Sequence, residues 1–246
     1  MSRTRIIPAL TIMGNRLVKT VKFKKPNYIG DPINAIKIFN EKRVDELFIL
    51  DIEASKQSRE PNYDLIYKMA GEAFMPIGYG GGIKTLEQAQ KIFSIGVEKV
   101  VLNTVILENP NVITQIAKIY GNQSVVLSLD FKKNILGKLR PHFNSGKEYL
   151  KREIKTFAEE MIGLGVGEII LQDIDKDGTF GGYNLEMINE LKSLSVPIVA
   201  LGGCNSIDNM KAAISSGANA VAAGSLFVYR NNDPQSILIN YPNIRL

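Results

Sequence analysis

Two stretches of the sequence repeat each other and decide the fold. PIGYGGGIKTLEQAQKIFSIGVEKVVLNT, residues 76–104, aligns without a gap with PIVALGGCNSIDNMKAAISSGANAVAAGS, residues 197–225. The offset of 121 residues is about half of the 246-residue chain. Each copy reads as a short apolar strand, a glycine turn, an amphipathic helix and a second apolar strand. The sequence therefore predicts two similar halves in which strands and helices alternate.

The repeat continues upstream of both stretches. ELFILDIEAS (residues 46–55) is similar to EIILQDIDKD (residues 168–177), and IIPALT (residues 6–11) is similar to VVLSLD (residues 125–130). Each half therefore contains four strand–helix units. Two halves of four units close naturally into one eight-stranded barrel.

Short runs rich in valine and isoleucine, typical of strands buried on both faces, alternate with amphipathic stretches along the whole chain. We predict strands at 5–11, 46–51, 76–79, 98–102, 124–130, 167–172, 197–201 and 219–223. We predict helices at 31–43, 62–73, 85–95, 109–119, 148–164, 184–194, 206–216 and 234–240. An open doubly wound sheet is the alternative, but the repeat favours closure. The predicted fold is α/β, a single (β/α)8 TIM barrel over residues 1–246, with half-barrels of about 1–120 and 121–246.

Composition limits the classes of function. The chain has 30 Lys and Arg against 25 Asp and Glu, a formal net charge of +5, which permits anionic substrates without requiring nucleic acid. A single cysteine, Cys204, excludes an internal disulfide framework, and we interpret it as a packing residue. The single histidine, His142, disfavours a metal site or a Ser-His-Asp triad, and we expect it in a solvated loop. We expect a cytoplasmic protein without metal, cofactor, nucleic-acid partner or membrane span.

Two long segments are predicted to be loops, residues 12–30 and residues 131–147. Both are basic, and they follow the equivalent first strand of each half. Loops after barrel strands lie at the carboxyl-terminal face, where barrel enzymes carry their active sites. The two segments are therefore candidate lids.

Glycine turns and polar residues end four of the predicted strands. Gly80-Gly81-Gly82 and Asn103-Thr104 in the first half correspond to Gly202-Gly203 and Gly224-Ser225 in the second half. Glycine lets the backbone approach a ligand, and the following helix offers unpaired N–H groups. A tight strand–helix turn is the alternative for each motif alone. Their duplication predicts two phosphate cups across one mouth and a substrate with a phosphate at each end.

Aspartates also end predicted strands. Asp51, Asp130 and Asp173 are candidates for general acid or base. The alternative is a helix cap or a salt bridge, which has equal weight for Asp51 and Asp173, whereas Asp130 precedes a basic segment and is the stronger candidate. Asp177-Gly178-Thr179 reads first as a turn and second as a substrate-holding loop.

Charged residues begin four strands at the opposite end of the predicted barrel. Two basic and two acidic side chains there can pair in a ring, because single buried charges are unfavourable. The ring is either a structural plug or a polar gate into the barrel axis, and its members are Arg5, Glu46, Lys99 and Glu168.

Four further motifs carry a family resemblance over essentially the whole chain: RIIPAL (5–10), FILDIEAS (48–55), DKDGT (175–179) and NIRL (243–246). With the repeat, they resemble the HisF-like cyclase subunit of imidazole glycerol phosphate synthase. The resemblance implies a barrel that receives ammonia from a glutaminase subunit docked at its amino-terminal face. Ammonia would pass along the barrel axis and react with a bisphosphorylated aminoimidazole-carboxamide ribonucleotide.

The resemblance also implies roles for individual residues. The four charged residues match the family's ammonia gate, and Asp130 matches a catalytic acid/base. The resemblance and the predicted cups together assign substrate or phosphate contacts to Lys19, Gly82, Asn103, Thr104, Asp177, Gly178, Thr179, Gly203, Gly224 and Ser225.

The mouth departs from the family pattern. Thr11 stands where the family has a carboxylate, so it is the position of a missing partner of Asp130. Threonine cannot accept a proton at neutral pH, and removal of an acid/base group lowers rates by about 10²–10⁴-fold. Ala9 replaces a usual cysteine, Leu201 replaces a small polar residue, and Gln172 replaces a hydroxyl residue.

These departures favour a diverged paralogue over a histidine-pathway cyclase. Such paralogues resemble proteins of surface-sugar gene sets, in which glutaminase and barrel supply ammonia to a separate sugar amidotransferase that forms an amidino group. The alternatives are a genuine histidine-biosynthesis cyclase and a non-catalytic scaffold that activates the glutaminase. A free-standing isomerase is a weaker alternative, because an isomerase needs no gate.

Overall fold

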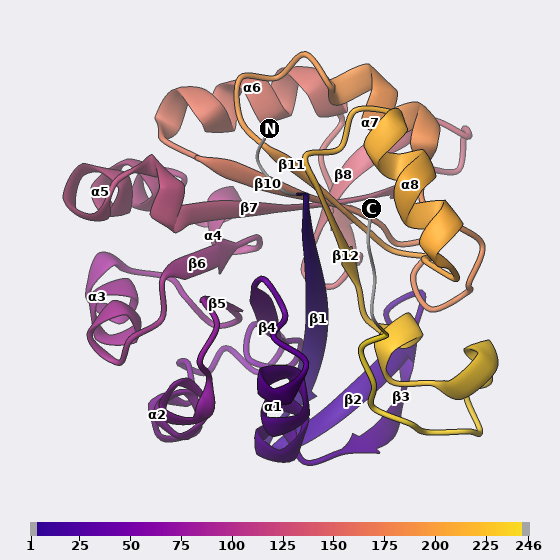
Figure 1. Cartoon of the computed structure of the whole chain (residues 1–246). Coiled ribbons are helices and arrows are strands. Elements are labelled where there is room, and N and C mark those ends of the chain that lie inside the picture. The colour runs from indigo at the N-terminus through magenta and orange to yellow at the C-terminus, as the bar shows by residue number, and fades with distance from the viewer. Residues whose placement is uncertain (1–3, 243–246) are drawn as a thin grey trace.

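Eight parallel strands close into a barrel in the computed structural model, which describes residues 4–242 (Figure 1). The strands are β1 (Arg5–Met13), β4 (Leu47–Asp51), β5 (Ile77–Gly80), β6 (Lys99–Leu102), β7 (Val125–Lys133), β10 (Glu168–Asp173), β11 (Ile198–Leu201) and β12 (Ala220–Ala223). Each pairs with its neighbour in chain order, β7 pairs with β10, and β12 pairs with β1. The predicted TIM barrel is confirmed. The NIRL motif at 243–246 lies outside the described residues.

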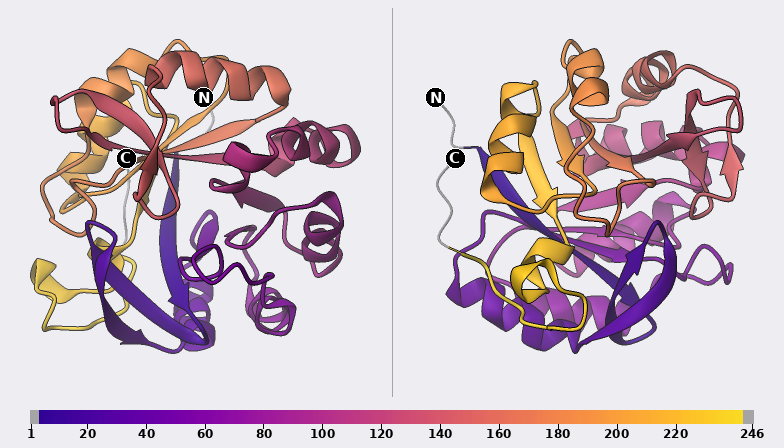
Figure 2. Two further views of the ribbon diagram at one scale, coloured as in Figure 1. Left: turned by 180° about the vertical axis from the view of Figure 1, so that it is seen from behind. Right: turned by 90° about the vertical axis from the view of Figure 1, so that its right-hand side faces the viewer.

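Helices surround the barrel and connect its strands (Figures 1 and 2). They are α1 (Pro32–Glu41), α2 (Tyr63–Glu72), α3 (Leu86–Ser94), α5 (Asn111–Tyr120), α6 (Ile154–Leu164), α7 (Leu185–Leu191) and α8 (Ile207–Ser215). Short turns of helix that the sequence analysis did not predict follow β6 and β12, as α4 (Val105–Glu108) and η2 (Ser225–Phe227). Two more 3₁₀ turns are η1 (Asn122–Ser124) and η3 (Arg230–Asn232).

The same local device begins the equivalent helices α3 and α8 in the two halves. The Thr85 hydroxyl accepts from the backbone N–H of Gln88 at 3.3 Å, and Ser206 accepts from that of Asn209 at 3.2 Å. These N-caps satisfy donors that a helix start otherwise leaves unpaired. The division of the chain into half-barrels at about residue 120 stays a prediction.

The two predicted loops are antiparallel hairpins, so the loop assignment was wrong. β1 continues to Met13 and pairs with β2 (Arg16–Val21), which pairs with β3 (Lys24–Gly30). β7 likewise continues to Lys133 and pairs with β8 (Leu139–Phe143), which pairs with β9 (Glu148–Tyr149). Antiparallel pairing satisfies backbone groups that a long loop would leave exposed. Both hairpins lie on the same side of the barrel (Figure 2, right).

Two helix predictions also need correction. The helix predicted at 148–164 begins only at Ile154, because the first two residues of the range form β9. No helix forms at 234–240 within the described residues; there the chain turns back, and Ile237 makes an isolated bridge to Tyr229.

The expected solvated position of His142 is wrong. His142 lies in β8 and is 6% exposed. Its Nδ1 lies 2.9 Å from the backbone oxygen of Arg140, and its ring stacks on that of Tyr149. Cys204 is buried, as the packing interpretation requires.

The core has two layers, one between barrel and helices and one inside the barrel. The inner layer is apolar and contains Ile7, Ala9, Phe48, Val101, Val126, Ile170, Val199, Leu201, Ala220 and Ala222. No helix among residues 4–242 has the length and apolar character to cross a bilayer.

Candidate functional site

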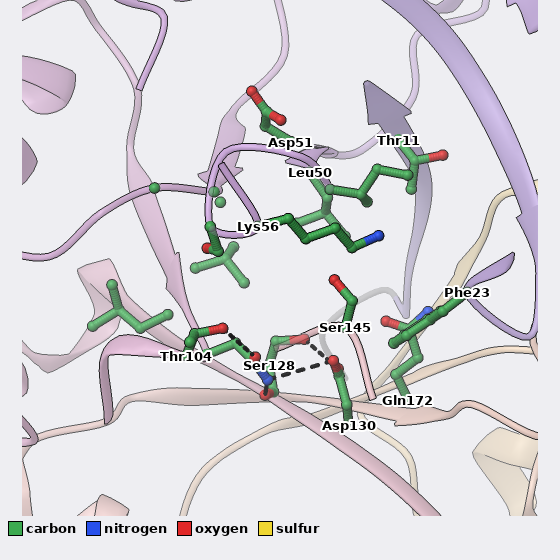
Figure 3. A pocket seen from close by; sticks show the side chains of 18 of the residues that line it. Thr11, Phe23, Leu50, Asp51, Lys56, Thr104, Ser128, Asp130, Ser145 and Gln172 are labelled. Atoms are coloured by element: carbon green, nitrogen blue, oxygen red, sulfur yellow. Dashed lines mark hydrogen bonds between the residues drawn. The ribbon is translucent and has the colours of Figure 1, made fainter. Parts of the chain in front are cut away.

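The larger of two neighbouring pockets opens at the carboxyl ends of the barrel strands (Figure 3). Side chains and turns from successive strands line it, including Gly82 after β5, Asn103 and Thr104 after β6, and Asp130 on β7. This is the face where the parallel strands of a barrel present catalytic groups.

The smaller pocket lies beside the larger one. The second half of the chain and the first hairpin supply its polar lining, which includes Lys19, Gly178, Gly203, Gly224 and Ser225. Both pockets are lined by Thr11, Leu50, Gln172 and Asp177. The two pockets therefore form one mouth with a glycine turn on either side.

Backbone geometry requires glycine at both turns. Gly82 and Gly203 have φ values of +73° and +89°, a region that disfavours other residues. A Cβ at Gly203 would lie 2.4 Å from the backbone oxygen of Gly182, and one at Gly82 would lie 2.7 Å from that of Arg59. The tight-turn reading thus accounts for both glycines, and phosphate binding at these turns is a proposal.

Asp130 lies at the centre of a hydrogen-bond cluster in the larger pocket. The Ser128 hydroxyl donates to Asp130 Oδ1 at 2.8 Å, and Asn103 Nδ2 donates to Oδ2 at 3.4 Å. Burial raises the pKa of Asp130 to about 7, and the hydrogen bond from Ser128 opposes the shift. A carboxyl group with a pKa near neutrality can act as either acid or base.

Lys19 and Asp177 form the second polar cluster. Lys19 is buried in β2, and its ammonium donates to the backbone oxygen of Ala9 at 2.6 Å. Burial lowers the pKa of Lys19 to about 8, against the opposing effect of the Asp177 charge. Burial also raises the pKa of Asp177, which accepts from Thr20 at 3.3 Å. Gly224 leaves room for the lysine, because a Cβ there would lie 2.1 Å from Lys19 Nζ.

Thr11 is placed at the junction of the two pockets, opposite Leu50 in the β1–β4 register. Its hydroxyl donates to the backbone oxygen of Val18 in the adjoining hairpin. Gln172 lies opposite Asp130 in the β7–β10 register, and Leu201 lies opposite Gln172. Of the positions at which the resemblance fails, Gln172 therefore neighbours Asp130, and Thr11 and Leu201 line the mouth on other strands.

The other two strand-end aspartates, Asp51 and Asp173, have structural roles. Asp51 forms a 2.7 Å salt bridge with Arg59 and accepts from the backbone N–H groups of Glu53 and Ala54. Asp173 accepts from Asn184 at 2.8 Å and from the backbone N–H of Asp175 at 2.9 Å. These contacts favour a helix-cap or salt-bridge role for Asp51 and Asp173 over a role as general acid or base.

The four charged residues that begin strands meet in a ring at the amino-terminal end of the barrel. Lys99 Nζ lies 2.6 Å from Glu46 Oε1 and 2.8 Å from Glu168 Oε2. Arg5 bridges the same two carboxylates from the other side. The two glutamate side chains are only 4–5% exposed. Two cations and two anions leave the ring without net charge, which lowers the cost of burying the two carboxylates.

The sequence analysis included one residue that lies elsewhere and missed others. Thr179 lines neither pocket; its hydroxyl donates to the backbone oxygen of Lys176 and accepts from the N–H of Gly181. Ser128 was missed, although it precedes Asp130 by two residues and so shares its face of the strand. Lys56 and Ser145 also line the larger pocket, and no sequence signal marked them.

Comparison with known proteins gives a consistent family assignment. A family model described as "Histidine biosynthesis protein" matches residues 5–233. A protein of Pseudomonas aeruginosa, provisionally named imidazole glycerol phosphate synthase subunit hisF2, is 49% identical over 99% of this chain and 98% of its own length. A protein of Leptospira borgpetersenii, provisionally named as subunit HisF, is 48% identical over 99% of this chain and 96% of its own. The HisF subunit of Exiguobacterium sibiricum is 37% identical, over 91% and 90%.

Proposed function

The chain belongs to the histidine biosynthesis protein family as a HisF-like cyclase-type subunit, and from that premise we propose that it accepts ammonia from a glutaminase partner. The ammonia enters at the charged ring, follows the barrel axis and leaves at the polar mouth. The observation that carries the proposal is the order of these three layers along one barrel: a charge-balanced ring, an apolar interior and a polar mouth.

The ring fits the role of a gate. It lies at the end of the barrel opposite the two pockets, because Arg5, Lys99 and Glu168 begin strands whose carboxyl ends form the mouth. Displacing one cation would open the ring while the remaining cation still compensates part of the carboxylate charge. A glutaminase docked on this face would deliver ammonia directly to the ring.

The barrel interior suits neutral ammonia rather than ammonium. Between ring and mouth the inner layer is apolar, and small side chains at Ala9, Ala220 and Ala222 contribute to it. An ammonium ion in such surroundings would lose hydration without gaining a compensating partner, whereas uncharged ammonia avoids that penalty.

The test of this proposal is complex formation. The protein and its cognate glutaminase should co-purify, and mixing should increase the rate of glutamine hydrolysis. Absence of a complex at micromolar concentration would contradict the proposal.

The acceptor is proposed to be a surface-sugar intermediate held by a separate sugar amidotransferase, which forms the amidino group. Support comes from Thr11, which is neutral and whose hydroxyl donates to the Val18 carbonyl. Asp130 therefore has no carboxylate partner at the end of β1. The numbered name hisF2 of one relative is that of an additional copy, which fits a paralogue. The cyclase activity of the wild-type chain would then be very low.

A histidine-pathway cyclase is the second candidate. The pKa of Asp130 near 7 and the duplicated glycine turns favour it, because an acid/base group and two phosphate sites suit a ring-closing reaction on a bisphosphate. Direct assay with the bisphosphorylated ribonucleotide distinguishes the two candidates.

A further inference from the structure

An unpaired lysine extends into the larger pocket from the segment after β4. Lys56 lines the pocket, and Figure 3 shows its side chain crossing the opening toward the side where Thr11 and Ser145 lie. The resemblance and the predicted cups assign it no role. Its position inside the mouth nevertheless brings a full positive charge to the ligand site.

The segment that carries Lys56 is held in place. Arg59 binds Asp51 at 2.7 Å, and the backbone N–H of Arg59 donates to the oxygen of Ala54 at 3.0 Å. The N–H of Gln57 donates to the oxygen of Glu53 at 3.0 Å. These contacts on both sides of Lys56 fix the backbone from which its side chain enters the pocket.

The charge of Lys56 is uncompensated within the described part of the chain. No salt bridge or hydrogen bond joins it to a residue in 4–242. The carboxylates of the pocket have other donors: Asp51 binds Arg59, Asp130 accepts from Ser128, and Asp177 accepts from Thr20.

Thr11 makes the excess charge possible. The internal repeat places Thr11 at the position equivalent to Asp130, and an aspartate there would face Lys56 across the pocket. Threonine is neutral, and its hydroxyl is already bonded to the Val18 carbonyl. The lysine is therefore free to bind an anionic group of a ligand.

We propose that Lys56 makes the larger pocket specific for a ligand that carries a second anionic group, a carboxylate, apart from its phosphate. The proposal rests on the second candidate function only in placing a phosphate in a glycine cup. It concerns a ligand of the barrel's own mouth and not the acceptor that the separate amidotransferase holds. The bisphosphorylated ribonucleotide of the histidine pathway has a neutral carboxamide between its phosphates, so its only anionic groups are the two phosphates that the two cups would hold.

The test uses two matched pairs of sugar phosphates that differ only in a carboxylate. They are 6-phosphogluconate with sorbitol 6-phosphate, and 3-phosphoglycerate with glycerol 3-phosphate. Dissociation constants are measured by calorimetry for the full-length protein, for Lys56→Gln and for Lys68→Gln. Lys68 is an exposed lysine on α2, so this control removes the same charge outside the pocket.

In at least one pair, the carboxylated ligand should bind the wild-type protein about tenfold more tightly, the effect of one charge-assisted hydrogen bond. Lys56→Gln should abolish the preference, and Lys68→Gln should retain it. Equal binding within both pairs, or a preference that survives Lys56→Gln, would overturn this inference and leave the phosphate cups untouched. Absence of binding by all four ligands would contradict both the inference and the phosphate cups.

Discussion

Removal of Lys99 should destabilise the barrel strongly, because two buried carboxylates share it. Lys99 lies within 2.8 Å of both Glu46 and Glu168, whose side chains are only 4–5% exposed. Removing one partner of a buried pair costs about 3–5 kcal/mol, because a charge is left without compensation. Arg5 still contacts both glutamates, so we expect the lower end, about 3 kcal/mol, for Lys99→Met. For a chain of this size, that lowers Tm by about 6–12 °C.

Thermal and urea unfolding measure this effect against a matched control. Lys68→Met removes an exposed lysine on α2 and should change the free energy of unfolding by less than about 0.5 kcal/mol. Adding Glu168→Gln to Lys99→Met should recover part of the loss, because one uncompensated carboxylate disappears. The same Lys99 variant should lower glutamine-driven amination of the acceptor relative to amination by free ammonium. A loss no larger than that of Lys68→Met would refute the ion-pair reasoning, and an unchanged amination ratio would refute the gate.

Three further predictions concern the mouth. Since burial raises the folded-state pKa of Asp130 from 3.8 to about 7, its ionisation destabilises the fold above about pH 4. Asp130→Asn should therefore gain stability relative to the wild type between pH 4 and pH 7, by up to about 4 kcal/mol, and a pH-independent difference in urea unfolding would contradict this. Phosphate affinity of the smaller pocket should begin to fall near pH 8, where Lys19 loses its proton, whereas a decline only above pH 10 in calorimetry would show an unshifted lysine. Thr11→Asp should raise ammonia-dependent cyclisation above the wild-type rate, and a revertant with no gain over wild type would argue that Thr11 is not the limiting change.

Much of the barrel can be predicted because its strands are buried on both faces. Such strands read as continuous apolar runs, and the repeat of four strand–helix units in each half favours closure into a barrel. The two hairpins were not predicted, since their strands mix basic, polar and apolar residues and pair with the extended ends of β1 and β7. Tertiary pairing, rather than local pattern, decides their structure.

The candidate site also contains residues that can be predicted from the sequence and residues that cannot. Asp130 can be found from its place at a strand end, and Ser128 could have been found from the two-residue period of a strand. Lys56 could not have been found in this way, because nothing in the sequence distinguishes it from other loop lysines. Only the path of the loop after β4 shows that it lies in the pocket. His142 was misplaced for a related reason: the strand that buries it exists only through pairing with β7.

The most direct test of the central claim is an assay of the wild-type protein with saturating ammonium and the bisphosphorylated aminoimidazole-carboxamide ribonucleotide. The same preparation must increase glutamine hydrolysis by its glutaminase, which shows that it is folded and competent for docking. The account predicts very slow or no detectable cyclisation, because Thr11 leaves Asp130 without a partner carboxylate. Turnover on the order of 1 s⁻¹, within the ordinary range for enzymes, would contradict it and identify a histidine-pathway cyclase.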